Sequence, residues 1–103
     1  MSAYLLTPLA KADIFNIWAY IAQDNEDSAT HVEQAIYDAC NFVAKSPMHG
    51  HTRRDLTSRS LRFWTLTKFT NYTVVYWPDP NPVEIIAVLH GKRNLRRILK
   101  QRP

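Results

Sequence analysis

Apolar residues recur at helical spacing in two consecutive stretches of the chain. Residues 8–23 carry one such stripe, and residues 26–45 carry a second, in which the apolar steps alternate between three and four residues. Thr7 can cap the first helix through its hydroxyl group, and Asp24-Asn25 ends that helix and can cap the second. Pro47 ends the second helix, because the residue before a proline disfavours helical dihedral angles. The short connection between the two stripes predicts an antiparallel helical hairpin.

Short β-type patterns lie on both sides of this hairpin. An aromatic and apolar run near the start of the chain predicts a first strand, and three more β-type runs follow the helices. The last of them is almost continuously apolar, which is typical of a strand buried on both faces. Three prolines within residues 78–82 forbid regular structure between the last two strands. The predicted strands are residues 3–7, 61–67, 72–77 and 83–90.

The remaining segments complete the expected fold. Residues 47–60 are polar and basic without periodicity, which predicts a loop, and Leu95, Ile98 and Leu99 indicate a short, very basic terminal helix. The three later strands form an antiparallel meander, and the first strand must return to pair in the sheet. We therefore expect one α+β domain over residues 1–103, an antiparallel sheet packed with an N-terminal helical hairpin. Its order is β-α-α-β-β-β with a short basic C-terminal helix.

Three side chains of the hairpin indicate how it packs. Ile14 and Trp18 lie on the stripe of the first helix and are expected in the core. Cys40 lies near the apolar face of the second helix and is interpreted as a small buried residue. As the only cysteine it excludes an internal disulfide and fits a reducing compartment. The chain has no run of 18 apolar residues and no signal-peptide pattern, so we expect a cytoplasmic protein that does not bind membranes.

Charge is distributed unevenly along the chain. Residues 1–50 hold two bases and six acids, whereas residues 51–103 hold eleven bases and three acids. The molecule is therefore electrically polarised, and its basic half suits an anionic partner or forms a solvated positive face.

Four segments in this order resemble the ParE branch of the ParE/RelE toxin superfamily. They correspond to the family's opening strand and turn, its first helix, its loop between helix and sheet, and the end of its last strand. Together they span nearly the whole chain, and the ordered set is more specific than any one member. The segments are residues 4–10 (YLLTPLA), 14–22 (IFNIWAYIA), 47–56 (PMHGHTRRDL) and 88–94 (VLHGKRN).

The resemblance implies the toxin of a type II toxin–antitoxin pair. Members of the ParE branch poison DNA gyrase and halt replication, whereas members of the RelE branch cleave mRNA on the ribosome. A cognate antitoxin silences the toxin by wrapping a segment around its hairpin and sheet, and the complex commonly represses its own operon. The resemblance therefore implies a hetero-oligomer that contacts operator DNA only through the antitoxin.

Two positions depart from the family pattern. Asn94 stands where the family usually has an aspartate, which removes any charge pairing by that side chain. Ser60 and Leu61 precede Arg62 where the family has a glycine. Both departures concern the geometry of loops rather than the fold.

The side chains allow two activities to be compared. Metal-free RNA cleavage needs a base, an acid and cations around the transition state, and the best set in this chain is His90, Arg62 and Arg93. RelE-type enzymes often add a C-terminal tyrosine, but no tyrosine follows Tyr76 here. A histidine that ends a strand before glycine also commonly bonds the backbone and fixes the turn. Gyrase poisoning is an act of binding, so the ParE interpretation expects no catalytic residue.

The basic surface is the expected target contact, because the arginine fork suits carboxylate and phosphate. The antitoxin groove is expected to expose a large aromatic side chain, with Trp64 and Trp77 as candidates. The candidates for target binding are Arg53, Arg54, Arg59, Arg62, Lys92, Arg93, Arg96 and Arg97, with Lys100 and Arg102 also in the basic tail.

Further alternatives concern function without toxicity. An inactive toxin homologue could retain only antitoxin binding, and the basic tail alone would suit a plain nucleic-acid-binding module. That tail lacks the aromatic pattern of a single-strand binder. His49 and His51 have no acid or cysteine near them in sequence, so we expect neither a metal site nor a cofactor.

Overall fold

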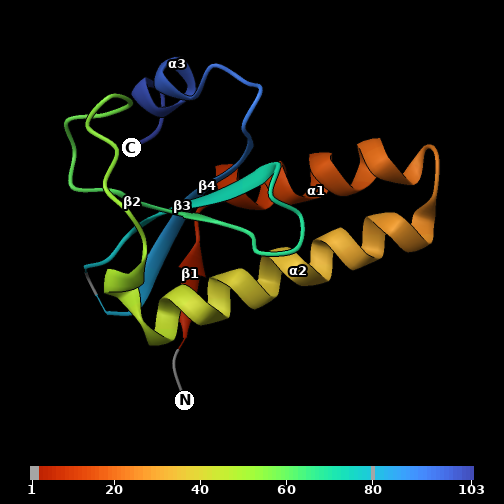
Figure 1. The fold of residues 1–103 in the computed structure, drawn as a ribbon, viewed down its shortest axis with the longest axis horizontal. Coiled ribbons are helices and arrows are strands. Elements are labelled where there is room, and N and C mark those ends of the chain that lie inside the picture. Colours follow the sequence, from red (N-terminus) through yellow and green to blue (C-terminus); the bar gives the residue numbers. More distant parts are fainter. Residues whose placement is uncertain (1–2, 80) are drawn as a thin grey trace.

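A computed structural model describes residues 3–79 and 81–103 of the chain. It has the expected α+β class and the expected order of elements (Figure 1). Pro80, within the proline-rich connection, lies outside the described residues. The elements are β1 (Tyr4–Leu6), α1 (Pro8–Ala22), α2 (Glu26–Lys45), the 3-10 helix η1 (Pro47–His49), β2 (Arg62–Thr65), β3 (Tyr72–Trp77), β4 (Val83–His90) and α3 (Leu95–Lys100).

The four strands form one sheet in the order β1-β4-β3-β2. β2, β3 and β4 make the expected antiparallel meander. β1 returns to pair in the sheet, as expected. Its partner is β4, to which it runs parallel, with Tyr4 opposite Val83 and Leu6 opposite Ile85. The sheet is therefore antiparallel except along this one pair, and β1 and β2 are its two edges.

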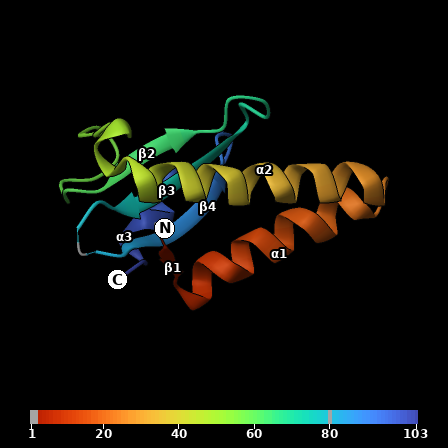
Figure 2. The same cartoon turned by 90° about the horizontal axis from the view of Figure 1, so that it is seen from below.

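The helices α1 and α2 pack side by side as a hairpin against one face of the sheet (Figure 2). Both expected caps are present. The Thr7 hydroxyl accepts a hydrogen bond from the Ala10 amide at 3.1 Å, and the Asn25 side chain accepts one from the Ser28 amide at 2.9 Å. Ile14 and Cys40 are buried in the cluster between the hairpin and the sheet, as predicted.

The prediction that Trp18 belongs to the core is wrong. Trp18 is only half-buried and lies outside the core cluster of the hairpin. Its indole N–H points across to α2, where it donates to the Thr30 hydroxyl at 3.4 Å. The hydrophobic stripe of α1 instead turns Ala10, Ile14 and Ile17 toward the sheet, so Trp18 falls at the margin between the two helices.

The opposite face of the sheet is covered by α3 and by the loop before β2 (Figure 1). A second apolar cluster forms there from Leu61, Phe63, Val75 and Leu99, among others. β4 is consequently buried on both faces, as its apolar pattern predicted.

A β-bulge in β4 shifts the register of the sheet. Val75 lies opposite Ala87, but the next residue, Tyr76, lies opposite Ile85, so Ile86 is the extra residue. Two consecutive side chains, Ile86 and Ala87, therefore face the α3 side, where both belong to the second cluster.

The segment 47–60 is more ordered than the predicted loop. It opens with η1, and His51 then pairs with Phe63 through two backbone hydrogen bonds of 2.8 Å. The sequence concealed both features because neither has a periodic apolar pattern. Within the described residues, no helix is long and apolar enough to span a membrane.

Candidate functional site

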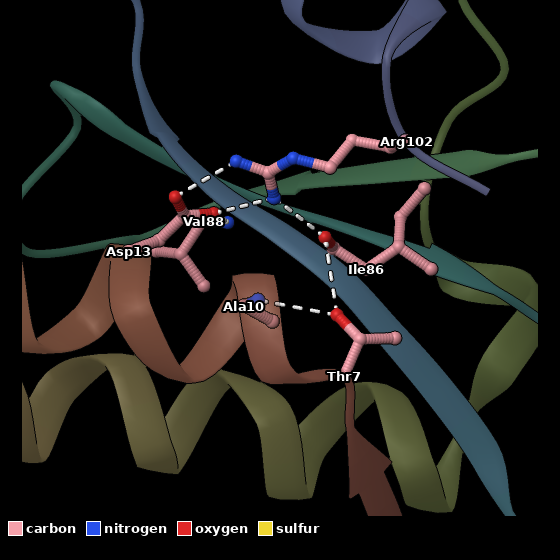
Figure 3. Close-up of polar contacts among 6 residues, drawn as sticks. All are labelled: Thr7, Ala10, Asp13, Ile86, Val88 and Arg102. Carbon is pink, nitrogen blue, oxygen red and sulfur yellow. Dashed lines mark hydrogen bonds and ion pairs between the residues drawn. The ribbon is translucent and has the colours of Figure 1, made fainter.

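The C-terminal segment is fixed to the first helix by an ion pair between Arg102 and Asp13 (Figure 3). The guanidinium group donates from Nη1 to Asp13 Oδ2 at 2.8 Å and from Nη2 to Asp13 Oδ1 at 2.9 Å. Both side chains are nearly buried, with exposed fractions of 10% and 8%. This two-pronged geometry is the strongest form of an arginine–carboxylate contact.

The same two side chains complete the hydrogen bonding of β4 where β1 ends (Figure 3). Arg102 donates to the carbonyl of the bulge residue Ile86 at 2.8 Å, and the Val88 amide donates to Asp13 Oδ2 at 3.0 Å. The Thr7 hydroxyl also donates to the Ile86 carbonyl, at 3.5 Å. Arg102, expected on the exposed basic surface, is therefore a buried structural residue.

Arg59 caps the end of α3 from the neighbouring loop. It donates to the Arg102 carbonyl at 2.7 Å and also to the Leu99 carbonyl. Its guanidinium carbon lies 5.9 Å from the centre of the Trp77 ring. A cation at a helix C-terminus offsets the negative end of the helix dipole, so the Arg59 side chain is already engaged within the fold.

Arg96 makes the reciprocal contact, from α3 back to the loop. Its guanidinium group donates twice to the Asp55 carbonyl, in one case at 3.1 Å from Nε. The Asp55 carboxylate meanwhile pairs with Arg53 at 2.7 Å. The Arg53 hydrogen bond holds the pKa of Asp55 below its ordinary value. Hydrogen bonds from Arg59 and Arg96 thus join the loop and α3 into one structural unit.

Four cations remain exposed around this unit and form no ion pair or side-chain hydrogen bond with any described residue. They are Lys92, Arg93, Arg97 and Lys100. On the α3 side of the sheet, Arg93 joins Arg53 and Arg96 in lining an open cavity of about 510 Å³. We call these exposed cations and this cavity the basic surface, and its chemistry suits phosphate or carboxylate groups.

The side chains of Arg62 and Arg54 are bonded to carbonyl groups of the loop before β2. Arg62 donates to the Gly50 carbonyl at 2.6 Å and to the Met48 carbonyl at 3.3 Å. Arg54 is exposed and donates to the Ser58 carbonyl at 3.1 Å. The loop carbonyls thus hold both guanidinium groups.

Tyr76, on β3, anchors the same loop through its hydroxyl group. Its hydroxyl accepts a hydrogen bond from the Gly50 amide at 3.0 Å and donates one to the Pro47 carbonyl at 2.6 Å. Burial raises the pKa of Tyr76 above its ordinary value, so the hydroxyl stays protonated and keeps both bonds.

The three residues of the ribonuclease hypothesis do not come together. Arg62 lies opposite Tyr76 and His90 lies opposite Tyr72, so the two are about 13 Å apart along β3, at a strand rise of about 3.3 Å per residue. His90 Nδ1 accepts a hydrogen bond from the Lys92 amide at 3.0 Å, the backbone bond that its place before Gly91 predicted. Arg93 follows His90 in the same turn, so only that pair is adjacent.

Trp64 and Trp77 lie on opposite faces of the sheet. Trp64 faces the hairpin, where its ring stacks on Phe42 with centroids 4.8 Å apart. An open cavity of about 360 Å³ lies beside them, between α2 and the edge strand β2. Trp77 faces the second cluster and lies beneath Arg59. The two tryptophans therefore cannot share one groove.

The histidines of the loop have packing roles. The His49 ring lies 5.2 Å from that of Phe42, and His51 pairs with β2 through its backbone. Within residues 3–79 and 81–103, no three His, Cys, Asp or Glu side chains lie close enough to hold a metal ion.

Three functional relationships were not predicted from the sequence. The ion pair between Asp13 and Arg102 had a signal in the sequence, because Asp13 is an acid on the apolar stripe of α1 and a buried acid requires a partner. The cap that Asn94 provides to α3, by accepting from the Arg97 amide at 3.1 Å, was also readable. The anchoring of the loop by Tyr76 had no local signal, since its partners are 26 and 29 positions away.

Comparisons with known proteins agree with this architecture. The family model described as "ParE toxin of type II toxin-antitoxin system, parDE" matches residues 4–95. A solved structure described as a chromosomal ParDE TA system from P. aeruginosa superposes with a TM-score of 0.69 and 17% identity. The match covers 87% of this chain and 96% of that one, and at this identity it shows the fold alone. No curated protein sequence matches the chain.

Proposed function

Because the chain belongs to the ParE family of type II toxins, we propose that it inhibits DNA gyrase and thereby replication, and that a cognate antitoxin neutralises it. The observation that carries the gyrase proposal is the basic surface around the β4–α3 turn. Lys92, Arg93 and Arg97 present their charges to solvent from a rigid support, since Arg59 and Arg96 tie α3 to the loop.

A rigid cationic surface suits binding rather than catalysis. Arginine forks can hold phosphates of DNA or carboxylates of a protein in fixed geometry. The polarised charge also speeds encounter with an anionic target. The toxin would then act by stabilising the complex of gyrase with cleaved DNA, a role that requires no acid–base pair.

The geometry favours this proposal over mRNA cleavage. His90 and Arg93 are adjacent, but Arg62 lies toward the other end of the sheet and is held by two loop carbonyls. A ribosome-dependent nuclease would need a base, an acid and cations around one phosphate. Only part of such a set is present at the β4–α3 turn.

The antitoxin is proposed to dock at α2 and β2. Phe42 and Trp64 offer a stacked pair of partly exposed rings beside an open cavity. Beyond the bridge from His51, no described strand covers the outer edge of β2. A partner segment could add main-chain hydrogen bonds at this edge and insert apolar side chains beside Trp64, the combination typical of strand addition.

A supercoiling assay with purified gyrase tests the function. The wild-type protein is expected to abolish supercoiling and accumulate cleaved DNA, and addition of antitoxin should reverse both effects. The double variant Arg93→Ala/Arg97→Ala should lose most of this inhibition while keeping the circular dichroism of the wild type. Lys11→Ala/Lys45→Ala is the matched control, because it removes the same charge from exposed positions on α1 and α2.

Two results would count against the proposal. A folded Arg93→Ala/Arg97→Ala variant that inhibits as strongly as the wild type would remove the basic surface from the mechanism. A folded wild-type protein that leaves gyrase untouched but cleaves mRNA on the ribosome would replace the function itself.

A further inference from the structure

A second cavity lies on the hairpin side of the sheet, next to the basic surface. The C-terminal half of α1 runs beside the start of β3 and the end of β4, and an open groove of about 510 Å³ lies between them. Its lining includes Asn16, Tyr20, Tyr72, His90 and Arg93. Arg93 also lines the cavity on the α3 side, so this one side chain borders both cavities, one on each face of the sheet.

The groove is rich in aromatic rings. Tyr20 is 75% exposed, although large aromatic side chains are usually buried. Tyr72 is half-buried, and its ring meets that of His90 edge to face at 5.2 Å. Burial, and then the nearby hydroxyl of Tyr20, raise the pKa of Tyr72. Both tyrosines line the groove, and Tyr20 leaves its ring available to a ligand.

Hydrogen-bond donors and cations lie at the mouth of the groove. Because His90 Nδ1 accepts from the Lys92 amide, the neutral ring carries its proton on Nε2, which can donate to a ligand. Lys92 and Arg93 are exposed and form no ion pair with any described residue. Asp13 is the acid of the groove, but its carboxylate is paired with Arg102, so the groove favours an anion.

We propose that this groove binds one nucleotide of a single-stranded nucleic acid, with the base against Tyr20 and the phosphate held by Lys92 and Arg93. Stacking on aromatic rings beside a basic track is how proteins hold unpaired bases. The Asn16 amide can donate to and accept from a base edge. The inference rests on the proposed function in one respect, since cleaved DNA on gyrase is the strand that would supply such a nucleotide.

An acidic peptide is the rival occupant, and the rings argue against it. The carboxylates of an acidic peptide would need only cations for binding, and the basic surface offers cations at several other positions. In this groove the cations lie beside three aromatic rings, from residues 20, 72 and 90, which lie far apart in the sequence. The chain for this reason has no continuous aromatic motif of a single-strand binder.

The test is an NMR titration of the purified full-length protein with hexathymidylate, and in parallel with the duplex of the same length and with a hexaglutamate peptide. Hexathymidylate should shift the amide resonances of Tyr20, Tyr72 and His90 and bind at least about tenfold more tightly than the duplex. Tyr20→Ala should weaken hexathymidylate binding by about tenfold. Phe15→Ala is the matched control, since Phe15 is another exposed ring on α1 that does not line the groove, and it should bind as the wild type does.

Three outcomes would overturn the proposal. They are an absence of shifts at the groove, equal binding by Tyr20→Ala and wild type, and stronger binding of hexaglutamate than of hexathymidylate at these residues. The titration contains no gyrase, so its result is separate from that of the supercoiling assay. Nucleotide binding without gyrase inhibition would refute only the proposed function, and inhibition without nucleotide binding would refute only the groove.

Discussion

Arg102 and Asp13 lie 89 positions apart in the sequence, yet their side chains meet in a two-pronged ion pair that occupies the backbone edge of β4. Arg102→Ala would leave the Asp13 carboxylate buried without its counter-charge. We expect the free energy of unfolding to fall by about 3–5 kcal/mol, the usual cost of breaking a buried pair on one side. Urea denaturation followed by circular dichroism measures this change.

Arg97→Ala is the control for that experiment, because Arg97 is exposed on α3, which ends two residues before Arg102. It should change stability by less than about 0.5 kcal/mol. The double variant Asp13→Asn/Arg102→Gln should be more stable than Arg102→Ala, since it buries no unpaired charge. An Arg102→Ala protein as stable as the Arg97→Ala protein would show that the pair contributes nothing.

Gly50 is required for space rather than for its backbone conformation. Its φ of −65° is open to any residue, but a Cβ atom there would lie 2.9 Å from two Tyr76 ring carbons and closer still to the hydroxyl. Gly50→Ala should therefore lower stability by about 1–3 kcal/mol, the usual cost of overpacking. Tyr76→Phe should cost about 1–3 kcal/mol, because two loop groups lose their partner.

The double variant Gly50→Ala/Tyr76→Phe separates the two effects. Once the hydroxyl is absent, the added methyl group has more room, so the double variant should lose less stability than the sum of the single variants. Thermal unfolding of the four proteins measures the coupling, and simple additivity would contradict the contact.

Cys40 makes stability depend on pH in the alkaline range. Burial raises the pKa of its thiol from 9.0 to about 12. Above pH 9 the unfolded chain loses this proton while the folded chain keeps it, so the unfolded state binds fewer protons and stability falls as pH rises. The expected loss is about 1 kcal/mol at pH 10.

Cys40→Ala provides the comparison, read from the slope of stability against pH between 8 and 10 rather than from absolute stability. The tyrosines whose pKa burial raises add a trend in the same direction to both proteins. Because Cys40 also raises the pKa of Tyr4 and Tyr37, the difference in slope belongs to the thiol together with its effect on these two tyrosines. Equal slopes would show that the thiol is accessible to water in the folded protein.

Trp64→Ala tests the proposed antitoxin groove. A stacked aromatic anchor commonly contributes at least about 2 kcal/mol to binding, so antitoxin affinity measured by calorimetry should fall by at least about that amount. Inhibition of gyrase by the free toxin should remain, because Trp64 lies away from the basic surface. Phe15→Ala is the control, and equal losses for both variants would remove Trp64 from the interface.

Much of this fold was predictable because its signals are local. The bounds of α2, β3 and β4 follow from periodicity, Pro47 and Gly91, and the caps by Thr7 and Asn25 were readable from residue type. The position of α3 on the far face was not, because it depends on Leu99 reaching a cluster formed by distant strands. The candidate site was predicted as a set of cations, but not its division into free charges and engaged ones. Arg59, Arg62 and Arg102 look like their exposed neighbours in sequence, and only the partners that they meet in the fold distinguish them.

The closure of β4 by side chains also limits how far a partner strand can extend along this sheet. On that margin, among the described residues, pairing is limited to the three-residue strand β1, and Asp13 and Arg102 occupy the backbone beyond it. The other margin, β2, is open past the His51 bridge. The two margins therefore differ: β2 offers four residues to an added strand, whereas a strand added at β1 meets only three residues and cannot continue along β4, where side chains already hold the backbone.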